Sequence, residues 1–165
     1  HETTKLCIAQ MRKYITGNQS VLDLGCGSGI LSMIAVKLGA KHVFGVDIDE
    51  LAVTASYENC RVNQIAPDQA AFARYDVIRE NPSVNPIKGQ YDIVVANILA
   101  DVIIPLSAKI APYMKDDGIF ISSGIINTKE QAVREALLKH GLDILEVSHM
   151  KDWVAFTAKK AAKKP

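Results

Sequence analysis

The segment 21–29, Val-Leu-Asp-Leu-Gly-Cys-Gly-Ser-Gly, constrains the fold more than any other part of the chain. A short apolar run followed by three alternating glycines predicts a buried strand that ends in a tight turn and opens a helix. A second apolar run, 42–46, ends at Asp47, which lies 22 residues after Gly25. This order of elements is typical of a nucleoside-binding site at the carboxyl ends of parallel strands.

Strand and helix signals alternate along most of the chain. Apolar runs predict strands at 20–24, 42–46, 70–75, 91–96, 118–122, 142–149 and 152–158. Helical periodicity predicts helices at 3–15, 29–38, 50–63, 98–114 and 128–140, and Pro105 is a point at which the fourth would kink or divide. This alternation predicts an α/β fold with three layers, in which helices cover both faces of a mostly parallel, seven-stranded, Rossmann-like sheet. The link between the last two strands is so short that they must form an antiparallel hairpin.

The length of 165 residues predicts one domain, which we place at 1–158, followed by a lysine-rich tail at 159–165. Four lysines lie in that tail, and removing their charges from the formal net charge of +1 leaves −3 for the rest of the chain. The tail is expected to be a solvated end. The charge of the domain therefore argues against a protein that binds nucleic acid through bulk electrostatics.

The cysteines and histidines bear on the cellular compartment and on metal binding. The three cysteines form no Cys-x-x-Cys pair, which favours a reducing compartment, and we expect a cytoplasmic protein. The four histidines form no cluster of ligands, so no metal site is predicted. The longest apolar region, 91–106, is interrupted by charged and polar residues, and a membrane span is not expected.

Two classes of nucleoside cofactor compete for the glycine turn. A dinucleotide site requires a third glycine at the position of Ile30, and its absence argues against NAD or FAD. S-adenosylmethionine carries adenosine and a methionine arm without a pyrophosphate. In this interpretation the backbone at Gly25 and Gly27 lies against the methionine and ribose portions of the cofactor. Asp23 binds its ammonium group, and Asp47 accepts hydrogen bonds from both ribose hydroxyls.

Two polar residues at the ends of later strands complete the predicted site. Asp76 follows the third strand and is a candidate acceptor for the adenine amino group, or alternatively a residue that binds only loop amides. Asn97 follows the apolar strand 91–96, where its amide would orient an amine nucleophile or contact the cofactor. The alternative for Asn97 is a cap of the helix that begins at Ile98.

Six segments of the chain occur together and in order in one known family. They are 1–7 (His-Glu-Thr-Thr-Lys-Leu-Cys), 22–32 (Leu-Asp-Leu-Gly-Cys-Gly-Ser-Gly-Ile-Leu-Ser), 47–49 (Asp-Ile-Asp), 96–100 (Ala-Asn-Ile-Leu-Ala), 123–125 (Ser-Gly-Ile) and 152–154 (Asp-Trp-Val). Over nearly its whole length the chain resembles the catalytic domain of the PrmA family, class I S-adenosylmethionine-dependent methyltransferases that act on the eleventh protein of the large ribosomal subunit.

The resemblance implies a cofactor, a substrate and site residues. It implies the class I methyltransferase fold, S-adenosylmethionine as cofactor, and Thr4, Gly25, Asp47 and Asn97 at cofactor-contacting positions. It also implies methylation of amino groups, on lysine side chains and the N-terminus, of a ribosomal protein. The family has a separate N-terminal substrate-recognition domain, which we expect to be absent from this chain, and no direct nucleic-acid partner is expected.

Three other functions remain open from the sequence. A class I methyltransferase with this site is also compatible with another protein, an RNA base or a small molecule as acceptor, although no aromatic residue follows Asn97-Ile98 to stack on a base. A non-catalytic module that binds S-adenosylmethionine is the second alternative. A nicotinamide-dependent oxidoreductase is the third, and Ile30 counts against it.

Overall fold

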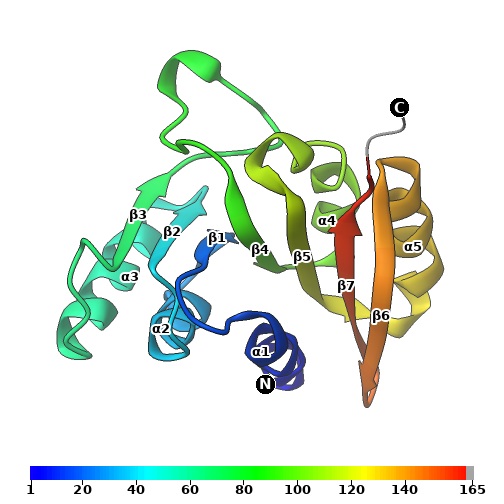
Figure 1. The fold of residues 1–165 in the computed structure, drawn as a ribbon, viewed down its shortest axis with the longest axis horizontal. Helices are drawn as coiled ribbons and strands as arrows, with labels where there is room; N and C mark the ends of the chain where they lie inside the picture. The colour runs from blue at the N-terminus through cyan, green and yellow to red at the C-terminus, as the bar shows by residue number, and fades with distance from the viewer. Residues whose placement is uncertain (163–165) are drawn as a thin grey trace.

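The computed structural model describes residues 1–162 and places them around one seven-stranded sheet (Figure 1). The strands are β1 (Ser20–Leu24), β2 (His42–Asp47), β3 (Ala70–Arg74), β4 (Tyr91–Asn97), β5 (Met114–Ile126), β6 (Leu142–Met150) and β7 (Trp153–Lys160). Their order in the sheet is β3-β2-β1-β4-β5-β7-β6. The first five strands are parallel, and β7 is antiparallel to both β5 and β6. The predicted α/β fold and its terminal hairpin are therefore confirmed.

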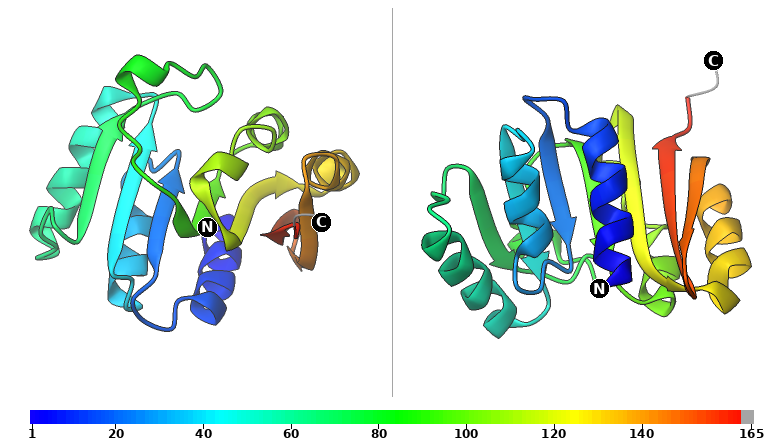
Figure 2. Two further views of the ribbon diagram at one scale, coloured as in Figure 1. Left: turned by 45° about the horizontal axis from the view of Figure 1, so that its top comes forward. Right: turned by 90° about the horizontal axis from the view of Figure 1, so that it is seen from below.

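Helices cover both faces of the sheet (Figure 2). Three of them, α1 (Glu2–Tyr14), α2 (Ile30–Lys37) and α3 (Glu50–Val62), pack on one face, and α4 (Ala100–Leu106) and α5 (Glu130–Lys139) pack on the other. Alternate residues of β1 supply the two cores: Val21 faces α1–α3, whereas Leu22 and Leu24 face α4 and α5. The parallel strands are thus buried on both faces, which agrees with their continuous apolar runs.

The predicted helix 98–114 is much shorter in the structure. It begins at Ala100 and ends at Leu106, after which the chain makes turns and a 3-10 helix, η2 (Ala111–Tyr113). Pro105 lies inside α4 and has no N–H to donate to the preceding turn. A second proline, Pro112, lies in η2. The two prolines explain why the apolar periodicity of this region does not produce one long helix.

Strand β5 is longer than predicted at both ends. It begins at Met114 instead of 118, because the Asp-Asp-Gly segment 116–118 is an irregularity within the strand: Met114 pairs with Tyr91 and Ile119 with Ile93. It ends at Ile126 instead of 122, because the strand continues through a second irregularity after Ser122. Glycines and acidic residues that predict turns are therefore accommodated here as bulges.

The connection from β3 to β4 contains no α-helix and forms a loop at 75–90 that protrudes from the sheet (Figure 1). Its one regular element is the 3-10 helix η1 (Pro82–Val84), as the prolines and asparagines of the sequence suggest. Two tyrosines hold the loop: the Asn81 N–H donates to the Tyr75 hydroxyl (3.0 Å), and the Asn85 amide donates to the Tyr113 hydroxyl (3.0 Å). These bonds fix the path of the chain around Asp76.

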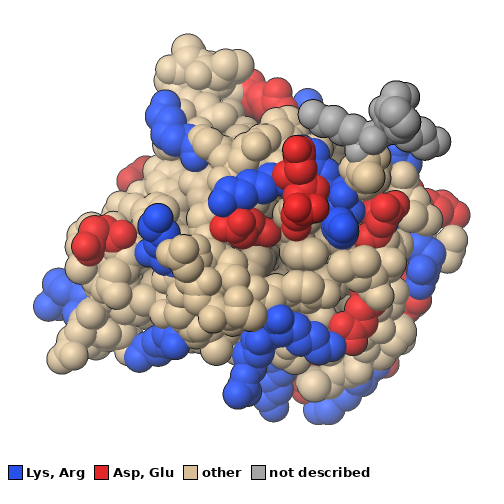
Figure 3. Space-filling view, in the orientation of Figure 1, with Lys and Arg blue, Asp and Glu red and all other residues tan. Residues whose placement is uncertain are grey.

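The predicted lysine-rich tail begins inside a strand. Lys159 and Lys160 belong to β7 and pair with Asp143 and Leu142 of β6, while Lys163 and Lys164 lie outside the described residues. Both signs of charge occur across the face drawn in Figure 3. Among residues 1–162, no helix is long and apolar enough to cross a membrane.

Candidate functional site

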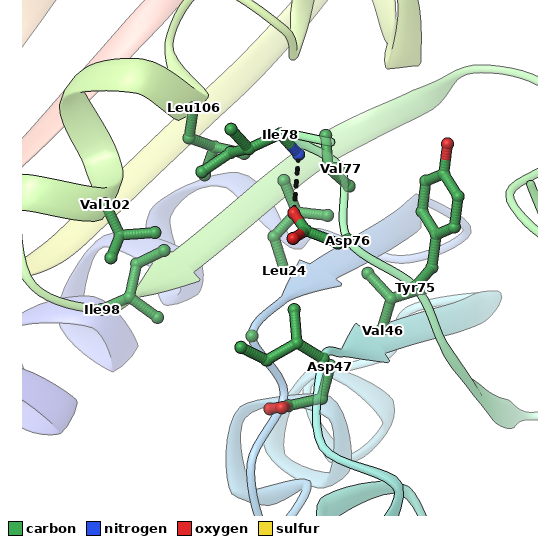
Figure 4. Close-up of a pocket in the computed structure, with 12 residues that line it drawn as sticks. Leu24, Val46, Asp47, Tyr75, Asp76, Val77, Ile78, Ile98, Val102 and Leu106 are labelled. Carbon is green, nitrogen blue, oxygen red and sulfur yellow. Dashed lines mark hydrogen bonds between the residues drawn. The ribbon is translucent and has the colours of Figure 1, made fainter. Parts of the chain in front are cut away.

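A cavity lies at the carboxyl ends of β1, β2 and β4, where the doubly wound topology predicts a ligand (Figure 4). We call it the Asp47 cavity. Its walls are largely aliphatic, and two carboxylates interrupt them. The lining residues are Leu24, Gly25, Val46, Asp47, Ile48, Tyr75, Asp76, Val77, Ile78, Ile98, Val102 and Leu106.

The glycine turn has the conformation that only glycine adopts readily. Gly25, Gly27 and Gly29 have φ values of 73°, 55° and 86°. The backbone approach is also close, because a Cβ on Gly25 would lie 2.7 Å from Cγ2 of Ile98. The turn is tied to β2 by the Gly25 N–H, which donates to the Val46 carbonyl oxygen at 2.8 Å. It therefore forms a bare backbone floor beside the cavity.

Asp47 is bonded directly to this turn. The Gly27 N–H donates to Oδ2 of Asp47 at 2.9 Å, and the Asp49 N–H donates to Oδ1 at 3.0 Å. Asp49 in turn caps α3 by accepting from the Leu51 N–H at 2.9 Å. Each Asp47 oxygen keeps a further lone pair. The carboxylate is thus held at the cavity edge with capacity for two more donors.

Asp23 lies deeper, with 1% of its surface exposed. The Ser32 hydroxyl donates to Oδ2 at 2.7 Å, while Oδ1 has no partner among the described residues. Burial, together with the nearby charge of Asp47, raises the pKa of Asp23 to about 6 against the opposing effect of the Ser32 hydrogen bond. Asp23 does not line the Asp47 cavity itself. An orphaned buried carboxylate oxygen beside the glycine turn is nevertheless suited to a cationic group.

This buried carboxyl makes stability depend on pH. Because the pKa of Asp23 is raised from 3.8 to about 6 on folding, its contribution is fully present below about pH 4 and is lost as the pH rises through 6. The unfolding free energy of the unliganded chain is expected to fall by about 3 kcal/mol across this window relative to that of Asp23→Asn. Urea unfolding at pH 4 and pH 7.5 measures the difference. If the unfolding free energies of the unmodified chain and of Asp23→Asn change equally between the two pH values, the raised pKa of Asp23 is excluded.

Asp76 lines the cavity but is partly engaged with its own loop (Figure 4). The Ile78 N–H donates to Oδ1 at 3.0 Å and the Arg79 N–H donates to the same oxygen at 3.3 Å. Oδ2 lies 4.0 Å from Nε of Arg79. The binding of loop amides is therefore observed, and contact with an adenine amino group through Oδ2 stays a prediction.

Asn97 and Thr4 meet although 93 residues separate them. The Asn97 amide nitrogen donates to the Thr4 hydroxyl at 3.4 Å. Asn97 ends β4, whereas α4 begins at Ala100 with Leu99 as its N-cap and no side-chain capping bond. The alternative prediction, in which Asn97 caps this helix, is therefore wrong. The fold instead brings together two residues that the resemblance places at the cofactor.

A second cavity adjoins the Asn97 side chain, and we call it the Asn97 cavity. It is lined by His1, Thr3, Asn97, Ile98, Leu99, Val102, Gly124 and Trp153. Ile98 and Val102 line both cavities, so the two spaces share part of one wall. The rings of His1 and Trp153 meet edge to face, with centroids 5.4 Å apart. The Asn97 cavity thus has an apolar and aromatic wall.

The contact between His1 and Trp153 in the wall of the Asn97 cavity is not predictable from the spacing of residues in the sequence. Trp153 comes from the hairpin between β6 and β7, and His1 precedes α1, so the two residues are distant in the chain. Only the antiparallel placement of β7 beside β5 brings the hairpin to the start of α1. No local motif around Trp153 signals this contact.

Nucleophilic cysteine and metal chemistry have little support. Burial raises the pKa of the Cys26 thiol to about 12, so it is protonated at neutral pH. Among the described residues no group of three or more His, Cys, Asp or Glu side chains is arranged to hold a metal ion. The chemistry of the site therefore rests on carboxylates, an amide and a hydroxyl.

Comparison with known proteins identifies the family of the chain. The family model described as ribosomal protein L11 methyltransferase (PrmA) matches residues 1–161. A protein of that name from Lachnoclostridium phytofermentans is 46% identical over an alignment of 181 positions. The alignment covers 99% of this chain and 53% of the relative. The chain thus spans about half the length of the curated relatives it matches.

Solved structures show the same fold. The crystal structure of ribosomal protein L11 methylase from Lactobacillus delbrueckii subsp. bulgaricus has a TM-score of 0.89 and 29% identity, covering 98% of this chain and 80% of that one. Magnesium protoporphyrin IX methyltransferase from Synechocystis, solved with bound SAM, has a TM-score of 0.75 and 21% identity, covering 97% and 79% of the two chains. The second likeness concerns the fold alone. From the match of the family model along nearly its whole length, the chain belongs to the ribosomal protein L11 methyltransferase (PrmA) family.

Proposed function

We propose that this chain binds S-adenosylmethionine in the Asp47 cavity and forms the catalytic part of a methyltransferase that modifies amino groups of a large-subunit ribosomal protein. The observation that carries the proposal is the arrangement of two adjoining cavities. A carboxylate is bonded to a bare glycine turn in one, and an Asn–Thr pair lies beside the other. The substrate class comes from the names of the relatives. This proposal places the protein in the cytoplasm, with the ribosomes.

The residues present fit this cofactor. Asp47 has lone pairs for the two ribose hydroxyls, and the aliphatic wall that includes Val77 suits an adenine ring. The orphaned Oδ1 of Asp23 is an acceptor for an ammonium group near the glycine turn. No Lys or Arg lines the cavity to balance a pyrophosphate, and Ile30 occupies the position of the third dinucleotide glycine. These features favour a cofactor without phosphate.

The chain's own residues have a limited task in the reaction. When bound, the cofactor supplies a methyl group already activated on a sulfonium, so no strong base or nucleophile is required from the protein. Asn97 holds an incoming amine through its amide oxygen, since an amide cannot act as a general base. Such positioning contributes about 7–11 kcal/mol to lowering the barrier. The site therefore acts chiefly by alignment.

The Asn97 cavity also prepares the nucleophile. A free lysine has a pKa of about 10.4, and only the neutral amine attacks a methyl group. Leu99 and Val102 are exposed in the unliganded chain, so the apolar side chains of the cavity would disfavour the charged ammonium form, and lower its pKa, once a bound substrate protein covers them. The proton would leave to solvent before transfer, and the task of the cavity would be to hold the neutral amine beside Asn97.

The test uses the full-length protein, because the relatives are about twice as long as this chain. The protein is incubated with methyl-labelled S-adenosylmethionine and, in separate reactions, with large-subunit ribosomal proteins and ribosomal RNA. Label on one ribosomal protein is the expected result. Label on RNA alone would move the acceptor to another class, and tight cofactor binding without any transfer would indicate a non-catalytic module.

A further inference from the structure

An irregularity in β5 lies directly beside the Asn97 cavity. Ser122 pairs with Phe156 and Ile125 pairs with Val154, so β5 takes three steps where β7 takes two. One extra residue is therefore inserted in β5 at 123–124, which is a β-bulge. Bulges of this kind redirect side chains and are common beside active sites.

Ser123 in this bulge is bonded to both segments that carry the Asn–Thr pair. Its hydroxyl donates to the carbonyl oxygen of Thr3 at 2.7 Å, and both residues are buried. Its own carbonyl oxygen accepts from the Ile98 N–H at 3.1 Å, and Ser123 is the register partner of Asn97 across β4 and β5. One residue thus connects the start of α1 to the end of β4.

The hydroxyl bond of Ser123 is additional to the helix's own hydrogen bonding. Thr3 lies in the first turn of α1, where a carbonyl ordinarily accepts from the N–H four residues later. Losing the Ser123 hydroxyl therefore does not leave that carbonyl unsatisfied. What is lost is the link that sets where Thr4 lies relative to Asn97.

Gly124 permits the close approach of β5 to Asn97. Its φ is +85°, a conformation that favours glycine. A Cβ at this position would lie 2.7 Å from the Ile98 carbonyl oxygen and 3.1 Å from Oδ1 of Asn97. Any side chain at Gly124 would therefore displace the Asn97 amide.

We propose that Ser123 and Gly124 are positioning residues for methyl transfer: the bulge holds Thr4 and Asn97 in one arrangement beside the Asn97 cavity. The proposal rests on the proposed function, since it assumes that the Asn–Thr pair contacts S-adenosylmethionine. Two contacts at the hairpin also hold the start of α1, namely the Lys151–Glu2 ion pair at 2.8 Å and the His1–Trp153 ring contact. Neither of these contacts involves β4, whereas Ser123 connects the start of α1 to the end of β4.

A matched pair of variants tests Ser123. Ser122 and Ser123 are adjacent and both 0% exposed, but the Ser122 hydroxyl has no partner among the described residues. Ser123→Ala is expected to raise the dissociation constant of this chain for S-adenosylmethionine about tenfold, the equivalent of one hydrogen bond. Ser122→Ala is expected to leave it unchanged. Isothermal titration calorimetry measures both, and the melting temperatures of the two variants are compared to identify a general loss of stability.

Two further readouts separate positioning from folding. Trp153 is the sole tryptophan of the chain, and its fluorescence change on cofactor addition is expected to be altered in Ser123→Ala and not in Ser122→Ala. In the full-length enzyme, Ser123→Ala is expected to raise the KM for the cofactor, and Gly124→Ala is expected to lower kcat. If Ser123→Ala does not fold, Ser123→Cys, whose thiol is too weak a donor to reproduce the 2.7 Å hydroxyl bond to Thr3, replaces it in the calorimetry.

The outcomes distinguish this proposal from the proposed function. If the unmodified chain does not bind S-adenosylmethionine, the proposed function fails. If it binds and Ser123→Ala (or Ser123→Cys in its place) binds equally well, the positioning role is overturned while the proposed function stands. Equal weakening by Ser122→Ala and Ser123→Ala would likewise overturn it, because the effect would then follow burial and not the bond to Thr3.

Discussion

Replacing Asp47 by alanine is expected to weaken the binding of S-adenosylmethionine by about 100-fold or more. The carboxylate would lose two charge-assisted hydrogen bonds to the ribose, each contributing about 1.5–3 kcal/mol. It would also release the Gly27 N–H, which now donates to Oδ2 at 2.9 Å, so the glycine turn would lose one of its links to the end of β2 and keep the backbone bonds to Val46. Isothermal titration calorimetry on the chain measures the change directly.

The neighbouring Asp49 provides a matched control for this experiment. It is also an acidic residue in the same connection, but its side chain accepts from the Leu51 N–H at 2.9 Å and caps α3. Asp49→Ala is expected to lower the unfolding free energy by about 1 kcal/mol and to leave cofactor affinity unchanged. An Asp47→Ala chain that binds the cofactor as tightly as the unmodified chain would remove the ribose assignment.

Replacing Asn97 by alanine is expected to lower kcat by about 100-fold with little change in stability. Removing one preorganised polar group at a reacting centre has effects of about this size. The cost in folding is small because Asn97 is only half-buried and its one side-chain hydrogen bond, to Thr4, is long at 3.4 Å. Initial rates at saturating cofactor, measured on the full-length protein, and thermal unfolding give the two quantities.

A double-mutant cycle with Thr4 tests whether the two residues act together. Thr4→Ala is expected to weaken cofactor binding, and the loss in the Asn97→Ala, Thr4→Ala double variant is expected to be smaller than the sum of the single losses, since the two side chains are bonded. Additive losses would show that they act independently. A normal rate for Asn97→Ala would reduce the residue to a structural element at the end of β4.

Much of the fold follows from local patterns in the sequence. The glycine turn of 25–29 requires positive φ values that other residues avoid, so the turn, the strand before it and the helix after it are predictable from nine residues. The apolar strand 91–96 signals burial on both faces in the same way. Because parallel strands place their carboxyl ends at one edge, the positions of Asp47 and Asn97 after their strands are enough to predict both at the same edge of the sheet.

The predictions from sequence were wrong or incomplete where a residue type occurs in two kinds of local structure. Asp116 and Gly118 occur in turns but also in bulges, and packing of β5 between β4 and β7 favours the bulge. Apolar periodicity continues past Leu106, but it does not show that Pro105 and Pro112 end the helical path. Asp76 binds loop amides through Oδ1, and no sequence pattern distinguishes this role from the predicted contact with a ligand.

By itself, the sequence determined the fold class, the glycine turn and the carboxylate beside it, because these depend on conformational preferences and periodicities within a few residues. The tertiary structure alone decided the bond between Asn97 and Thr4, the link from Ser123 to Thr3 across 120 residues, and the aromatic wall of His1 and Trp153. Contacts over such separations depend on strand order and on the extra residue in β5, which the packing of whole elements selects and no short segment encodes.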